Sequence, residues 1–163
     1  MSNSEPDLFR AQVSDLLGTS VLHALGLKES LAAEKAALET QDIDALNEAV
    51  ANKSRCVTKL QALDSERTTL CAEAGFEMGP DQMDKVMQWC DTDSIIANCW
   101  NHLMQLAAEC NALNMTNGAI IRARQHQIHA NLSVLRGQPP EADTYGREAG
   151  GAAPNLRRSL AEA

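Results

Sequence analysis

Residues 96–135 read IANCWNHLMQLAAECNALNMTNGAIIRARQHQIHANLSVL, and this stretch decides the fold. Positions suited to packing alternate four and three residues apart along its whole length: Ile96, Trp100, Leu103, Ala107, Cys110, Asn114, Asn117, Ile121, Arg124, Ile128, Asn131 and Leu135. This spacing predicts one helix of roughly 40 residues, about 60 Å long. The Asn117-Gly118 dipeptide favours turns, but the phase is the same on both sides of it, which favours a continuous helix. We expect Gly118 to permit close contact with another helix.

The chain before this stretch predicts a first long helix that runs to about Glu39. It begins at Ser4, which is suited to capping, and Pro6, which suits the first turn. Gly18 and Gly26 each weaken the helix by up to ~1 kcal/mol. Its apolar residues nevertheless follow helical spacing: Phe9, Val13, Leu16, Leu17, Val21, Leu25, Leu31 and Leu38.

A break at residues 40–42, with Asp42 as the next cap, leads into a second long helix. Its packing positions are Leu46, Ala49, Lys53, Cys56, Leu60, Leu63, Arg67 and Leu70. We expect Lys53 and Arg67 to lay their methylenes on apolar surface and to keep their charges in water. Because the connection is short, the first two helices should pack as antiparallel neighbours.

Residues 75–80, GFEMGP, predict a loop, and Asp81 to Cys90 predict a short helix that presents Met83, Val86, Met87 and Cys90. Only 3% of the residues are aromatic, which points to thin seams between long helices. The predicted fold is all-α, an antiparallel long-helix hairpin or bundle with coiled-coil-like packing, three long helices and one short. We expect it to occupy residues 1–136 as one domain.

The remaining residues, 137–163, are rich in Gly, Pro and Ala and have almost no apolar bulk. Such a segment cannot bury enough surface to offset the entropy of ordering, so we expect a flexible tail. Within it, Pro154 to Leu160 has the composition for a turn or two of helix, which is marginal at that length.

The charge and cysteine content narrow the classes of partner and compartment. Fourteen basic against twenty-two acidic residues give a net charge of −8, which argues against nucleic acid and anionic membranes as partners. No apolar run reaches the ~20 residues of a membrane span, and the N-terminal residues do not resemble a signal peptide. We expect a cytoplasmic protein whose five cysteines are reduced core residues.

The sequence contains no recognisable catalytic or metal-binding pattern. Cys99 and His102 share a helical face, but without a CxxC pair they are weak metal candidates, and His126 and His129 are expected to be exposed. No phosphate loop or nucleophile elbow is present. Acidic residues such as Asp91 and Asp93 precede the start of a helix, where capping explains them. We therefore expect no enzyme activity, no metal and no cofactor.

Three short stretches occur in a characteristic order. The first holds Leu31, EKAAL at 34–38, Asp42, Leu46, Lys53, Leu60, Leu63 and Arg67. The second holds Trp100 and a Leu-Asn-x-x-Asn-Gly motif at 113–118, and the third is Thr144-Tyr145-Gly146. Together they resemble the FlgN family of flagellar type III export chaperones. This chain departs from the family pattern after Tyr-Gly, where Arg147, Glu148 and Ala149 precede Gly150 in place of an acidic-Gly pair.

The resemblance implies a chaperone that binds the C-terminal segments of hook-filament junction proteins, keeps them unassembled and delivers them to the cytoplasmic domain of the export gate. It implies that the last helix recognises the client, for which the candidate residues are Asn114, Asn117, Gly118, Ile121, Ile128, Leu132 and Leu135. It also implies that Tyr145 and Gly146 dock to the gate. An apolar seam can bind an amphipathic client segment by acting as its missing helical partner.

Two questions stay open at the level of sequence. Asn114 and Asn117 lie on the predicted seam, where they either pair across helices to fix register or line a groove open to the client. The seam itself can close on the chain's own helices, on a second copy or on a client. A structural coiled-coil adaptor or self-assembling helical protein is therefore the alternative to a chaperone, and a metal-binding or redox helical protein is a more distant one.

Overall fold

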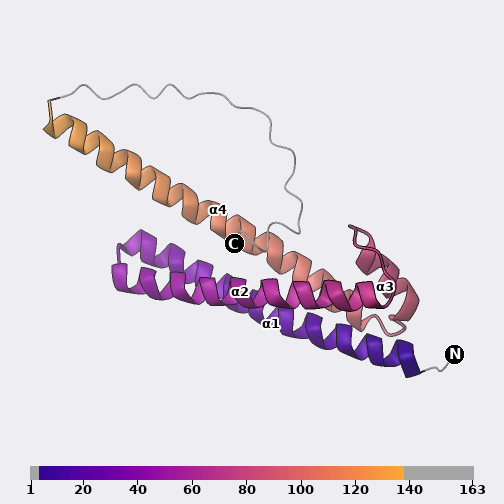
Figure 1. Ribbon diagram of the computed structural model, residues 1–163. Coiled ribbons are helices and arrows are strands. Elements are labelled where there is room, and N and C mark those ends of the chain that lie inside the picture. Colours follow the sequence, from indigo (N-terminus) through magenta and orange to yellow (C-terminus); the bar gives the residue numbers. More distant parts are fainter. Residues whose placement is uncertain (1–3, 138–163) are drawn as a thin grey trace.

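The computed structural model describes residues 4–137, which form an elongated, all-helical molecule (Figure 1). The helices are α1 (Ser4–Thr40), α2 (Ile43–Glu73), α3 (Gln82–Cys90) and α4 (Ile95–Leu135), and no strand occurs in this range. The prediction of three long helices and one short helix is confirmed. The predicted tail lies almost wholly outside the described residues.

Helix α1 is the centre of the molecule because it packs along both α2 and α4. It runs antiparallel to α2, with which it forms the predicted hairpin (Figure 1). Its register with α4 is parallel. The side chains of Arg10 and Asp93 form one contact between these segments, Glu34 and Asn117 form another, and each pair is 83 positions apart in sequence.

Helix α1 has a heptad pattern of buried positions that its apolar residues alone do not indicate. Its buried positions include a run that alternates four and three residues apart: Val13, Leu17, Ser20, Ala24, Leu27, Leu31, Glu34 and Leu38. Leu25, which is among the apolar residues in helical spacing, does not belong to this run, because it is 37% exposed. Small and polar residues occupy three of these packing positions, so large apolar side chains alone do not reveal the seam.

The start and the packing face of α2 are as predicted. The Asp42 carboxylate caps the helix by accepting a hydrogen bond from the Ala45 N–H at 3.0 Å. All eight predicted packing positions, Leu46 to Leu70, are buried or half-buried. Gly26 of α1 lies close to this helix, because a Cβ at that position would be 3.3 Å from the Cys56 sulfur.

The expectation that Lys53 and Arg67 keep their charges in water is wrong. The Lys53 ammonium forms an ion pair at 2.9 Å with the buried Glu34 carboxylate. The Arg67 side chain is only 4% exposed, donates to Asp64 Oδ1 at 2.7 Å and lies over the Trp100 ring, 5.2 Å from its centroid. Lys53 is half-buried and Arg67 is buried because an acid, and for Arg67 also an aromatic face, compensates each charge.

The end of the molecule opposite the α1–α2 turn is closed by α3 and the loop before it. The rings of Phe9, Phe76 and Trp89 pack together with centroids 5.5 to 6.0 Å apart. Helix α3 buries Met83, Val86 and Cys90, as predicted, and Met87 is half-buried.

The start of α4 is fixed by the acids predicted to cap it. The Asp91 carboxylate accepts from the N–H groups of Ile96 and Ala97, at 3.0 and 2.8 Å. From there α4 runs without interruption through Gly118 to Leu135, which confirms the continuous helix. Within residues 4–137, no helix is long and apolar enough to cross a membrane.

Candidate functional site

The environment of α4 changes at Asn117. Before it, the predicted packing positions from Ile96 onward are buried or half-buried against the body, and after it no residue of the helix is buried. Arg124 contacts the backbone of Glu39, next to the last residue of α1, so the residues beyond Arg124 extend past the hairpin. At 1.5 Å per residue this extension, residues 125–135, is about 17 Å long. We call residues 118–136 the arm, and its projection is visible in Figure 1.

The arm carries an apolar stripe that continues the buried face of α4. At 100° per residue, Ile121, Ile128, Leu132 and Leu135 fall on the same side of the helix as Cys110 and Asn117. In the body this face packs on α1, but on the arm it is open, with Ile128 58% and Leu135 82% exposed. Six of the fourteen exposed large hydrophobic residues lie between Met115 and Leu135, so this segment is where unburied apolar surface concentrates.

A groove of about 400 Å³ lies where the arm leaves the body. It is lined by Glu34, Lys53, Asn114, Met115, Asn117, Gly118, Ile121 and Arg122. Four of the predicted client-binding residues therefore meet in one groove, together with side chains from α1 and α2. The other three, Ile128, Leu132 and Leu135, lie farther along the arm.

Asn117 joins three helices at the base of the arm. Its side chain is 98% buried, and its amide group donates to Leu31 O at 3.0 Å and to Glu34 Oε2 at 2.7 Å. The other oxygen of Glu34 accepts from Lys53 of α2. Because both partners of the Asn117 amide are acceptors, its orientation is fixed by the network. Its own oxygen, Oδ1, is buried and has no hydrogen-bond partner.

Two neighbours of Asn117 differ from it. Asn114 is half-buried and lines the groove. A Cβ on Gly118 would meet the guanidinium of Arg122 first, at 3.3 Å, and this residue belongs to the same helix. The expected close approach of another helix at Gly118 is therefore wrong, and Gly26 is the glycine at which two helices come close.

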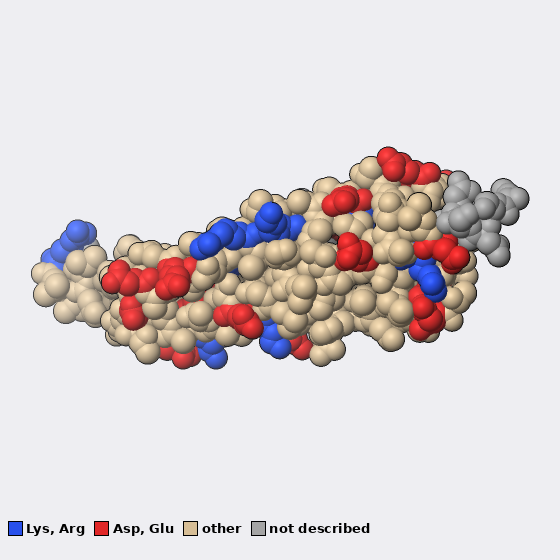
Figure 2. All heavy atoms as spheres, turned by 90° about the horizontal axis from the view of Figure 1, so that it is seen from below, with Lys and Arg blue, Asp and Glu red and all other residues tan. Residues whose placement is uncertain are grey.

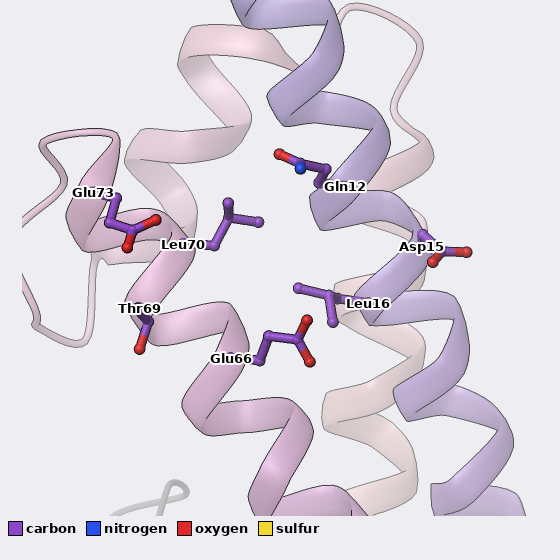
Figure 3. A pocket seen from close by; sticks show the side chains of 7 residues that line it. All are labelled: Gln12, Asp15, Leu16, Glu66, Thr69, Leu70 and Glu73. Carbon is purple, nitrogen blue, oxygen red and sulfur yellow. The ribbon is translucent and has the colours of Figure 1, made fainter.

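A second hollow of about 400 Å³ lies between α1 and α2, nearer the other end of the molecule (Figure 3). Asp15, Glu66 and Glu73 line it together with Leu16 and Leu70. Its acidic lining contrasts with the arm, which contains three arginines and no Asp or Glu. A client that suits one of these two places by charge is repelled from the other.

The cysteines and histidines of the described residues form no reactive site. All five cysteines are free, and burial raises the pKa of the Cys110 thiol to about 11, which keeps it protonated at neutral pH. His126 and His129 are exposed, as predicted. No group of three potential metal ligands occurs within residues 4–137.

Comparison with known protein families gives a match. A model of the FlgN family, described as FlgN protein, matches residues 12–152. The match begins in the first half of α1, includes α2, α3, α4 and the arm, and extends to the predicted gate-docking residues Tyr145 and Gly146, which lie outside the described residues. No curated protein and no solved structure gives a match.

Proposed function

Because the chain belongs to the FlgN family of flagellar export chaperones, we propose that it binds the C-terminal amphipathic segments of hook-filament junction proteins in the cytoplasm. It keeps these segments from assembling and delivers the junction proteins to the type III export gate. The family is one of chaperones and not of enzymes. The expected family resemblance is thereby confirmed, whereas the identity of the client is our proposal.

The observation that carries this proposal is the arm. An amphipathic helix gains stability when its apolar face is covered, and the arm offers an uncovered stripe in continuity with the groove at its base. A client helix laid on Ile128 and Leu132 would replace the partner that α1 provides in the body. Client binding by Asn114 and Gly118 is proposed on the same ground, since both line the groove. Asn117 contributes by fixing the direction of the arm.

The test is a calorimetric titration of the full chain with the C-terminal segment of a junction protein. We expect one-to-one, submicromolar binding. The variant Ile128→Ser/Leu132→Ser should weaken it by a hundredfold or more, because burying each such side chain contributes ~1.5–3 kcal/mol. The control is Leu8→Ser/Leu22→Ser, which removes two exposed apolar side chains from α1.

If Ile128→Ser/Leu132→Ser binds the segment as tightly as the wild type, the arm is excluded as the client site. The absence of binding to any junction segment would favour the adaptor alternative, in which the stripe is covered by a second copy of the chain. Circular dichroism of each variant separates loss of binding from loss of helix.

We also propose that Tyr145 and Gly146 dock to the cytoplasmic domain of the export gate, and that residues 137–163 act as a separate, flexible part of the chain. A lone aromatic residue in a segment of little apolar bulk can dominate a weak contact. Tyr145→Ala should abolish binding to the gate domain and leave client binding unchanged. A chain truncated after Leu135 should behave in the same way, and loss of client binding on truncation would instead assign the tail to the client.

A further inference from the structure

The charge of the arm is opposite to that of the rest of the molecule. It contains Arg122, Arg124 and Arg136, and no Asp or Glu occurs between Glu109 and Glu141. All twenty-two acidic residues therefore lie outside the arm, together with only eleven of the fourteen basic ones. On the face shown in Figure 2, the narrow tip where α4 projects carries basic atoms and no acidic ones, whereas the body carries groups of both acidic and basic atoms.

The basic residues border the apolar stripe on both sides. At 100° per residue, Arg124 lies along one edge of the stripe, and Arg136 and Arg122 lie along the other. The same edge begins in the groove, where Arg122 is a lining residue near Lys53. Arg124 occupies a seam position itself, and Arg122 and Arg136 directly follow the seam residues Ile121 and Leu135. Long arginine side chains at these places can lie along apolar surface and present their charges beside a helix bound to the stripe.

From this arrangement we propose that the arm selects its client by charge, and that the occupant is an amphipathic helix whose apolar face is flanked by Asp or Glu. The inference rests on the proposed function, because it describes the client that the arm would take. It also disfavours a second copy of the chain as the occupant, since two paired arms bring arginines against arginines with no acid to compensate them.

The acidic hollow of Figure 3 supports the same assignment by contrast. A segment flanked by acids is repelled by Asp15, Glu66 and Glu73, so the body offers it no competing place there. The net charge of −8 also slows its approach to the body as a whole. The arm therefore attracts a client that this hollow repels.

The experiment uses the full chain and the C-terminal segment of its junction protein. The variant Arg122→Glu/Arg136→Glu reverses the charge of one edge without breaking a hydrogen bond of the fold. The control Arg55→Glu/Lys59→Glu makes the same change of charge on α2, where these residues line a different hollow. We expect the arm variant to weaken binding by about tenfold, as expected when exposed attractive pairs become repulsive, and the control to bind like the wild type.

Salt and a charge swap complete the test. Raising the salt concentration from about 0.1 to about 1 M shortens the Debye length from ~10 to ~3 Å. This change should weaken binding of the segment to the wild type more than its binding to Arg122→Glu/Arg136→Glu. A segment whose flanking acids are replaced by Lys should prefer the arm variant to the wild type.

The outcomes separate the two proposals. If the arm variant binds as tightly as the wild type at both salt concentrations, the charge inference is overturned while the chaperone function stands. If Ile128→Ser/Leu132→Ser also binds normally, the arm is not the client site, and if no segment binds at all, the proposed function itself fails. A dimer of the chain that is lost on Leu132→Ser, without any client binding, would assign the stripe to a second copy.

Discussion

Asn117 illustrates how a single amide orients a long helix. Its two donated hydrogen bonds connect α4 to the backbone and to a buried acid of α1, and that acid is held by Lys53 of α2. A register shift of one residue between α1 and α4 would remove these donors from Glu34 and leave a buried carboxylate short of partners. The geometry is that of a polar residue that specifies register at some cost in stability, and Oδ1 without a partner is part of that cost.

We therefore expect Asn117→Ala to lower the free energy of unfolding by ~1–3 kcal/mol, because Glu34 loses its donor from α4 in a buried place. Urea denaturation followed by circular dichroism measures the change. Asn101→Ala is the control, since Asn101 is exposed on the same helix and alanine is the better helix former. Equal stability of the Asn117 variant and the wild type would mean that the network does not hold α4 in place.

At this scale the sequence indicates which residues face a seam and not what they meet. The heptad places Asn117 on the packing face of α4, and the same reasoning places Lys53 and Arg67 on that of α2. Glu34 was not identified as the partner of Lys53 because charge pairing across helices depends on register, which the spacing within one helix does not contain. Asp64 lies three residues before Arg67 on the same helix, so that ion pair could have been predicted from the sequence. The contact between Arg67 and the Trp100 ring also joins two helices, so it depends on register and was not predicted.

At the scale of whole elements, Gly26 of α1 and Gly118 of α4 differ in what surrounds them. Gly118 has the flexible end of Arg122 as its nearest neighbour, whereas Gly26 faces the sulfur of Cys56 across the packed α1–α2 seam. Gly118→Ala should raise the free energy of unfolding by ~0.5–1 kcal/mol, because Ala is the better helix former and Arg122 can move aside. Gly26→Ala should gain less or lose stability, because the two helices must separate slightly. Thermal unfolding of the two variants measures this difference, and equal changes in their melting temperatures would contradict it.

The lengths and ends of the helices were predictable because periodicity, capping and short connections act within a few residues. Asp42 and Asp91 are the clearest cases. The central position of α1 in the molecule was not predictable, because its packing positions include Ser20, Ala24 and Glu34, which are not large apolar residues. The parallel packing of α4 on α1 was also out of reach, because an amphipathic face does not specify which of two neighbours it covers.

At the scale of the molecule, one continuous helix serves two purposes. Its first half completes the body by covering α1, and its second half leaves the body with the same face uncovered. The sequence could indicate the apolar positions of the arm, because the heptad continues to Leu135. It could not indicate that they would be exposed, since that depends on α1 ending at Thr40, near the position where Arg124 passes it.

This division predicts a difference in local stability along α4. Amide hydrogens in a helix packed on its neighbours exchange only on larger openings, whereas those of a helix end without tertiary contacts exchange through fraying. Hydrogen exchange followed by mass spectrometry should show fast exchange in residues 119–136 and slow exchange in residues 96–117. The client segment should slow exchange in the arm and leave the α1–α2 hairpin unchanged, which serves as the internal control. Uniform protection along α4 in the free chain would mean that the arm is already covered, and protection by the client confined to the hairpin would move the binding site to the body.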